Sequence, residues 1–110
     1  MKAICFAVFV AACGTDAACP RDTPSSCPSP TPSYTTDVVP VLNTYCNDCH
    51  SPTGQASDRP FQTYQQVFNR RTSILSFTAN CQMPPPDFPQ PTEPERVALL
   101  GWLACGAPDN

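Results

Sequence analysis

The sequence predicts a small all-α domain, and three observations support this fold class. Apolar residues recur at helical spacing in separate segments, the clearest of which begins with capping residues and ends at a glycine and a proline. No segment alternates apolar and polar residues convincingly, as a half-buried strand does. With 110 residues and eight cysteines, the chain suits one domain whose thin core is supported by cross-links.

The N-terminus has the pattern of an export signal. Met1 and Lys2 precede an uncharged apolar run that reaches residue 12 and is too short to span a membrane. Residues 10–13, VAAC, resemble the bacterial lipobox, so we expect residues 1–12 to be cleaved and Cys13 to be lipidated. Ordinary cleavage near residues 17–18, or no cleavage, are the alternatives. The prediction is an exported protein, in the periplasm or on the outer surface, held at a membrane only by its lipid.

Residues 13–33 are predicted to form a lipid-anchored stem. The part from Cys19 onward reads CPRDTPSSCPSPTPS, in which prolines alternate with serine and threonine and favour extended polyproline geometry. An ordered segment pinned to the domain by Cys19 and Cys27 is the alternative.

The domain itself is expected to span residues 34–110 and to begin with a helix near 38–45. Apolar residues recur there at i, i+3, i+4 and i+7, with a capping threonine or aspartate before them and Pro40 in the first turn. The same spacing predicts a helix over 64–71 with Thr63 as its cap, followed by an apolar segment at 74–77. The last helix, 93–104, starts at a capping box of Thr92 and Glu95 and is apolar nearly all round, so it should be buried on more than one side.

The most informative motif is CNDCH at residues 46–50, which has the CxxCH spacing of covalent haem attachment. Two thiols three positions apart can each add to one vinyl group of a porphyrin, so Cys46 and Cys49 are the predicted thioether sites. The next residue, His50, then places an imidazole nitrogen on the iron. It is the single histidine of the chain, so no other histidine competes for this role.

Two other chemistries fit parts of the same motif. Its three ligating residues, together with Cys81 or Cys105, would complete a Cys₃His zinc site. A redox-active CxxC pair is the weaker alternative, because it calls for a strand–helix–strand context that the sequence does not indicate. A zinc site would give no role to Met83, a second candidate iron ligand, and this favours haem.

That second ligand is Met83, the only methionine besides Met1. Its thioether is soft and uncharged, which suits ferrous iron. A lone methionine commonly fills a core, but residues 84–86 are three prolines, which fix the backbone of a loop. A stiff loop that presents one sulfur is typical of an axial ligand, so the iron is expected between His50 and Met83.

Taken together, a helix that runs into CNDCH, a later MPP and an apolar C-terminal helix with an aromatic residue resemble a class I cytochrome c domain over residues 34–108. The resemblance implies one covalent haem c, His50 and Met83 on opposite faces of the iron, and first and last helices that cross near one haem edge. Two features depart from the family. The glycine-rich segment after the motif is reduced to SPTG, and Cys81 and Cys105 bracket the methionine loop.

The resemblance also suggests which residues surround the haem. The carbonyl of Pro52 is the family-like acceptor for the second ring N–H of His50. Four aromatic residues are expected to bury the ring: Phe61, Phe68, Phe77 and Trp102. Four residues are candidates for the haem propionates, although isolated arginines are commonly solvated surface residues: Arg59, Arg70, Arg71 and Trp102.

The remaining cysteines are disulfide candidates, which an oxidising compartment would favour. Cys19, Cys27, Cys81 and Cys105 allow three pairings. The simplest pairs Cys19 with Cys27 and Cys81 with Cys105, the second closing a loop around the methionine. Buried free thiols at Cys81 and Cys105 are the alternative.

Charge and site chemistry limit the function classes. Nine acidic residues against six basic ones give a net charge of −3, which argues against nucleic acid as a partner. With both axial positions filled, we expect a one-electron carrier that meets a redox partner protein and is not an enzyme. The alternatives are a haem enzyme or gas sensor with an open or labile sixth site, and a structural lipoprotein stabilised by zinc or disulfides.

Overall fold

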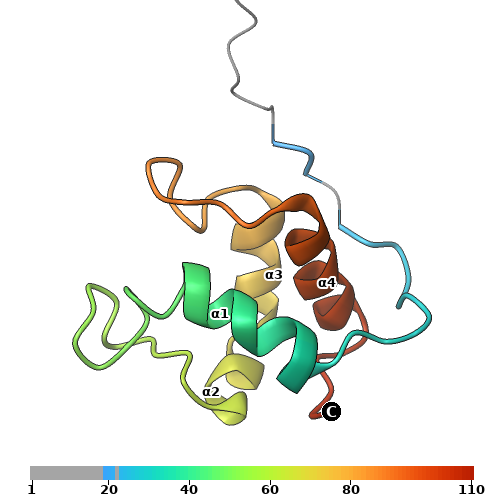
Figure 1. Cartoon of the computed structure of the whole chain (residues 1–110), viewed down its shortest axis with the longest axis horizontal. Coiled ribbons are helices and arrows are strands. Elements are labelled where there is room, and N and C mark those ends of the chain that lie inside the picture. Colours follow the sequence, from blue (N-terminus) through green and yellow to red (C-terminus); the bar gives the residue numbers. More distant parts are fainter. Residues whose placement is uncertain (1–18, 22) are drawn as a thin grey trace, which may run out of the picture.

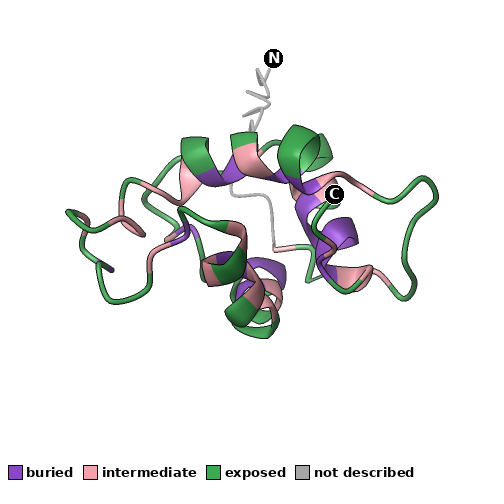
Figure 2. Cartoon of the chain, turned by 90° about the horizontal axis from the view of Figure 1, so that it is seen from below, coloured by how far each residue is buried: buried purple, intermediate pink, exposed green. Residues whose placement is uncertain are grey.

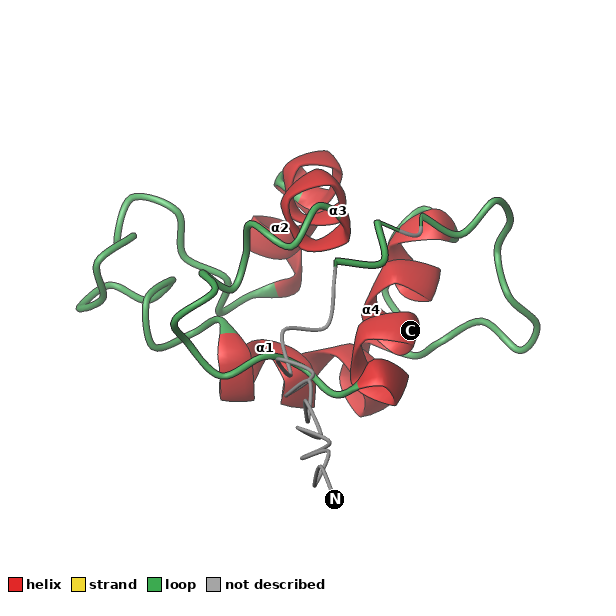
Figure 3. Cartoon of the chain, turned by 90° about the horizontal axis from the view of Figure 1, so that it is seen from above, coloured by secondary structure: helices red, strands yellow, loops and turns green. Residues whose placement is uncertain are grey.

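A computed structural model describes residues 19–21 and 23–110 (Figure 1). The predicted signal segment 1–12 and the lipidation candidate Cys13 lie outside the described residues. All regular secondary structure in the described part is helical, which confirms the all-α class. Long irregular segments, residues 46–63 and 80–92, join the first α-helix to the second and the third to the fourth (Figure 3). Within these residues no helix combines the length and the apolar character that a membrane crossing requires.

The first helical segment begins earlier than the sequence predicts. A π-helical turn, η1 (Tyr34–Val38), runs directly into α1 (Val39–Tyr45). Ser33 caps η1 by accepting a hydrogen bond from the backbone N–H of Thr36 at 3.2 Å. Pro40 is the second residue of α1, where its fixed φ suits a helix, although it has no N–H to donate to the preceding turn of η1.

The predicted helix over 64–71 is divided in two. Thr63 caps α2 (Tyr64–Asn69), as predicted, and it also forms a capping box with Gln66. Arg70 then leaves the helical region, with φ −111° and ψ 12°, and Arg71 opens a separate helix, α3 (Arg71–Ala79). The apolar segment 74–77 therefore belongs to a helix.

The last helix, α4 (Glu93–Ala104), forms with the predicted bounds and capping box. Four large residues along it are buried: Leu99, Leu100, Trp102 and Leu103. Buried residues of the several helices face one another (Figure 2). Trp102 lies at the centre of this core, where its ring centroid is 5.4 Å from that of Tyr34 and its indole N–H donates to the carbonyl of Pro108.

The disulfide pairing differs from the predicted one. Cys19 is bonded to Cys81 and Cys27 to Cys105, so the pairing of Cys19 with Cys27 and of Cys81 with Cys105 is wrong, although all four candidate cysteines do form disulfides. Both bonds join the N-terminal segment to distant parts of the domain. The alternative of free thiols at Cys81 and Cys105 is also wrong.

The proline-rich segment is ordered against the domain in its described part. We call residues 23–33 the strap. A Cβ atom on Gly101 of α4 would lie 2.9 Å from Cγ of Pro28, so the strap runs in contact with that helix. At its end, Ser33 donates from its hydroxyl to the main-chain oxygen of Asn110, and Asn110 donates to the carbonyl of Pro32. The described part of this segment is thus tied to the domain by the disulfides of Cys19 and Cys27 and by the contact of Pro28 with α4.

Candidate functional site

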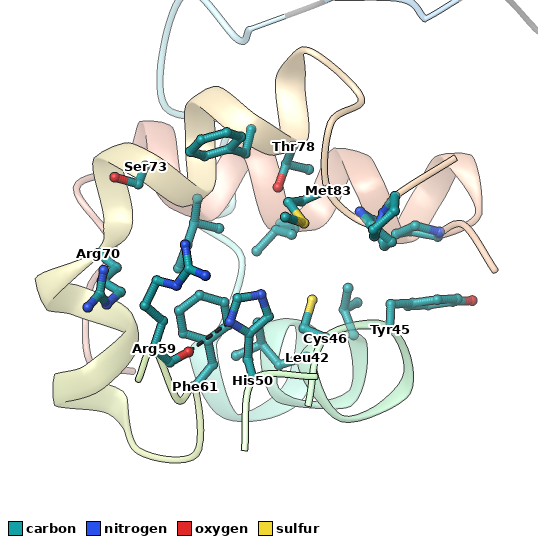
Figure 4. A pocket seen from close by; sticks show the side chains of 17 residues that line it. Leu42, Tyr45, Cys46, His50, Arg59, Phe61, Arg70, Ser73, Thr78 and Met83 are labelled. Carbon is teal, nitrogen blue, oxygen red and sulfur yellow. Dashed lines mark hydrogen bonds between the residues drawn. The ribbon is translucent and has the colours of Figure 1, made fainter. Parts of the chain in front are cut away.

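An apolar cavity lies between α1, α3 and the loop that follows α3 (Figure 4). Its volume is about 180 Å³, and the whole concavity with its open mouth holds about 970 Å³. A large flat ligand would therefore be enclosed in part, with the remainder in the open mouth. The walls are mainly apolar and come from four elements, with Leu42 from α1, Ile74 and Phe77 from α3, Pro84 from the loop and Leu99 from α4.

The CNDCH motif forms a tight turn at the C-terminal end of α1. The backbone N–H groups of Cys49 and His50 both donate to the carbonyl of Cys46, at 3.2 and 2.9 Å. The following loop folds back onto this turn, since Ala56 donates from its N–H to the carbonyl of Cys49. Gly54 makes this approach possible, because a Cβ there would lie 2.6 Å from the carbonyl oxygen of Asp48 and closer still to that of Cys49.

Both thiols of the motif are free and half-buried. Cys46 lines the cavity, whereas Cys49 does not. Burial raises the pKa of the Cys46 thiol to about 11, with a smaller contribution from neighbouring Cys49, so Cys46 is a neutral thiol at neutral pH.

The His50 ring is held from two sides at the cavity wall. Its Nδ1 lies 2.7 Å from the main-chain oxygen of Arg59, and its ring stacks on Phe61 with centroids 4.1 Å apart and planes 18° apart. The resemblance suggests the carbonyl of Pro52 as the acceptor, but in the structure the acceptor is the carbonyl of Arg59. Because a carbonyl can only accept, Nδ1 carries the proton and the lone pair of His50 is on Nε2. That tautomer is the one that ligates a metal through Nε2.

Met83 lies across the cavity from His50 (Figure 4). Its backbone N–H donates to the carbonyl of Phe77 at 3.1 Å, which ties the loop to the last turn of α3. The side-chain amide of Gln90 bridges the carbonyls of Pro84, Pro85 and Phe88, so the loop is held by internal hydrogen bonds. The Met83 side chain is 39% exposed.

Arg96 of α4, which the sequence does not single out, holds the start of this loop. It donates to the main-chain oxygens of Thr78 and Ala79, at 2.6 and 3.1 Å. In the sequence it is one charged residue at the beginning of an apolar helix, so only its tertiary partners reveal its role.

Only some of the residues that were expected around the haem line the cavity. Among the aromatic candidates, Phe61 and Phe77 line the cavity, whereas Phe68 and Trp102 do not. Arg71 lies over the ring of Phe68, 4.0 Å from its centroid, and it too is away from the cavity. The candidates that do line it are Arg59 and Arg70. Phe68, Trp102 and Arg71 are therefore not among the residues that line this cavity, and their expected haem contacts stay predictions.

The four-ligand zinc site cannot form as the sequence suggests. It needs a thiolate from Cys81 or Cys105, and both sulfurs are bonded in disulfides. Across residues 19–21 and 23–110, no three histidine, cysteine or acidic side chains gather closely enough to hold a metal ion together.

The donor set of the cavity fits a haem. An imidazole with a free Nε2 lies on one side, a thioether on the other, and a free thiol at the wall, within mainly apolar surroundings. No protein-family model, curated protein sequence or solved structure matches the chain. The function has to be inferred from this site itself.

Proposed function

We propose that the protein is a mono-haem c-type cytochrome that carries single electrons. The observation that carries the proposal is that His50 and Met83 lie on opposite sides of one apolar cavity, which Cys46 also lines (Figure 4). In this proposal Cys46 and Cys49 hold the haem through thioethers, and His50 and Met83 ligate its iron. The likeness to class I cytochrome c domains rests on the same residues.

The residues of the chain have distinct roles in this proposal. Each thiol adds across one vinyl C=C bond, so that a C–S bond forms, the thiol proton goes to the neighbouring carbon and nothing leaves. The Arg59 carbonyl fixes the tautomer and direction of His50. The bound haem supplies one iron that alternates between the ferrous and ferric states. Met83 and the apolar wall both favour the reduced state, because neither compensates the extra charge of ferric iron.

A six-coordinate haem also limits the partners that the protein can have. With two protein ligands on the iron, substrate has no coordination position, so we propose a carrier and not an enzyme. Its partner is then a redox protein that donates or accepts the electron. Export, a position in the periplasm or on the outer surface, and a lipid anchor on Cys13 complete the proposal, since thioether attachment takes place outside the cytoplasm.

The decisive experiment is to express the full chain in a host with cytochrome maturation machinery. A pyridine haemochrome of the purified protein should show haem c, and the ferric protein should show the methionine-to-iron charge-transfer band. Met83→Ala should lose the band and keep the haem, whereas Gln82→Ala, the adjacent exposed control, should retain both. A colourless protein would contradict the proposal and leave a disulfide-stabilised structural lipoprotein.

One observation favours a second function. Met83 lines the cavity and is 39% exposed, so this residue is not sealed inside the core. A haem enzyme or gas sensor with a labile sixth position would have this property. A high-spin ferric spectrum of the wild-type protein, or rapid binding of carbon monoxide without loss of fold, would favour this function over electron transfer.

A further inference from the structure

The loop that carries Met83, residues 80–92, is covalently tied to the N-terminal segment just before the methionine. The disulfide from Cys19 ends at Cys81, between the last turn of α3 and Met83. In Figure 1 the first described residues, in blue, lie beside the C-terminal end of α3. Phe77 and Thr78 before Cys81 line the cavity, and so does Met83 after it. The bond therefore lies where the chain leaves the helix and enters the methionine loop.

Cys81 has a backbone conformation that is unfavourable for its residue type. Its φ is +58°, in the left-handed region, where the Cβ of any residue but glycine crowds the backbone. Such a residue persists only where its surroundings hold it there. At Cys81 the surroundings supply the bond to Cys19 and a 3.1 Å hydrogen bond from its N–H to the carbonyl of Thr78. This turn sets the direction in which the chain leaves α3, and so it sets the position of Met83.

The hydrogen bonds after this turn hold the methionine less firmly than a covalent bond does. The N–H groups of Gln82 and Met83 both donate to one acceptor, the carbonyl of Phe77, at 2.9 and 3.1 Å. Both donors belong to exposed residues, so water competes for them. Arg96 acts on main-chain oxygens that precede the turn, at the end of α3. The turn itself is held by the disulfide.

The second disulfide provides a contrast within the same molecule. Cys27 and Cys105 join the strap to the end of α4, where Cys105 has a right-handed φ of −82°. Both of these described residues lie outside the lining of the cavity. Their sequence separation is 78, against 62 for Cys19 and Cys81, so this bond restricts the unfolded chain at least as much. A change at Met83 that follows loss of the Cys19–Cys81 bond alone is therefore not an effect of general stability.

We propose that the Cys19–Cys81 disulfide positions Met83 and that its reduction opens the sixth position of the iron. This inference rests on the proposed function. The reductant is a dithiol protein of the compartment to which the chain is exported. One of its thiolates attacks the disulfide and its second thiol completes the exchange, so the bond takes up two electrons and two protons while the dithiol becomes a disulfide. Cys19 and Cys81 are only half-buried, which leaves the bond open to this attack.

The state of this bond then selects between the two functions considered above. While the bond is intact, Met83 stays opposite His50 and the protein carries electrons. Once the bond is reduced, Cys81 can return to the right-handed region that its side chain favours, and Met83 leaves its position. The iron then offers its sixth position to a small ligand. An electron carrier becomes a ligand-binding haem protein without a change in its haem.

The first test follows carbon monoxide binding by the haem-loaded full chain, kept ferrous with ascorbate. Cys19→Ser with Cys81→Ser should bind roughly tenfold faster than wild type, because ligand entry follows the fraction of molecules whose Met83 is off the iron. Its ferric form should lose most of the methionine-to-iron band. Cys27→Ser with Cys105→Ser is the matched control and should resemble wild type in both measurements.

The second test reduces the native disulfide instead of removing it. Dithiothreitol should accelerate carbon monoxide binding by the wild-type protein as much as the Cys19 and Cys81 substitutions do, and oxidised glutathione should reverse the change. It should add nothing to the variant that lacks this bond. This measurement starts from folded wild-type protein, so it decides the question even where that variant does not fold. Equal rates in the two double variants, or a wild-type rate that dithiothreitol leaves unchanged, would overturn the proposal.

A third measurement does not require haem. Amide hydrogen exchange at Gln82 and Met83 in the purified full chain should be faster without the Cys19–Cys81 bond and unchanged without the Cys27–Cys105 bond. Equal exchange in the two variants would also overturn the proposal. If the wild-type chain attaches no haem, the proposed function fails, while hydrogen exchange still tests whether this disulfide holds Met83.

Discussion

Arg96 binds the main-chain oxygen of Thr78 at 2.6 Å and so fastens the last turn of α3 to α4. The carbonyls at a helix C-terminus lack partners within the helix. Here one guanidinium satisfies two of them, and the next residues along the chain lead to Met83. The position of the methionine therefore depends on α4 as well as on its own loop.

Arg96→Lys should loosen the methionine loop. An ammonium cannot bridge the oxygens of Thr78 and Ala79 in a planar fork. The Thr78 carbonyl still accepts from the N–H of Cys81, but a buried carbonyl that loses its partner, as that of Ala79 would, costs about 1–3 kcal/mol. We expect a lower unfolding temperature and, in the haem protein, a weaker methionine-to-iron band. Arg71→Lys is the control. Equal bands in Arg96→Lys and wild type would show that Arg96 does not position Met83.

Peptide mapping under non-reducing conditions should find Cys19 linked to Cys81 and Cys27 linked to Cys105. Both loops are long, with sequence separations of 62 and 78, so each bond restricts the unfolded chain substantially. Recovery of one peptide that contains an internal bond between Cys19 and Cys27 would contradict the described connectivity.

This pairing shows why one part of the fold was mispredicted. The proline-rich composition between Cys19 and Cys27 correctly favours an extended backbone, which spans about 3.1 Å per residue. An extended segment of this length holds its ends well beyond the roughly 7 Å that a disulfide permits between Cα atoms. The composition therefore argued against the short pairing, but the sequence alone does not say which distant cysteines the strap reaches.

The helices were predictable to the extent that they carry local signals. Capping boxes and apolar spacing mark the starts of α2 and α4, and both start where predicted. The break between α2 and α3 was not predictable, because Arg70 is neither glycine nor proline and so carries no local signal for a helix end.

Some residues of the candidate site could be predicted from the sequence and others could not. The side chains with distinctive chemistry, Cys46, His50 and Met83, could be chosen from the sequence, and the structure gathers them at one cavity. The acceptor for His50 is a main-chain oxygen, which every residue possesses. The carbonyl of Arg59 thus has no sequence signature, and the family-like position of Pro52 was misleading.

Gly54→Ala should disturb the turn formed by the CNDCH motif. The added methyl group would meet the carbonyl oxygens of Asp48 and Cys49, so the backbone must shift, and overpacking of this kind costs about 1–3 kcal/mol. We expect a lower unfolding temperature and less attached haem. Gly101→Ala is an informative comparison because its methyl group would press on Pro28 of the strap instead. Normal haem content in Gly54→Ala would argue against a tight requirement at this turn.

Alkylation of the haem-free protein should report the burial of Cys46. The pKa of this thiol is raised to about 11, so the reactive thiolate is scarce at pH 8 and its fraction rises as the pH approaches 11. In Cys49→Ser, which leaves Cys46 as the single free thiol of the described residues, iodoacetamide should react slowly at pH 8 and much faster in urea. Similar rates in the folded and unfolded protein would show that Cys46 is not shielded.

The disulfide connectivity has a consequence for how an exported chain matures. A chain that crosses a membrane from its N-terminus delivers Cys19 and Cys27 first, and their partners Cys81 and Cys105 last. Along the chain, the cysteines that lie between these two and their partners are Cys46 and Cys49 of the CxxCH motif, which are free thiols in the structure. In the proposed cytochrome, haem attachment would consume those two thiols and so remove them as wrong partners. In such a chain, early haem attachment would also reduce the formation of incorrect disulfides.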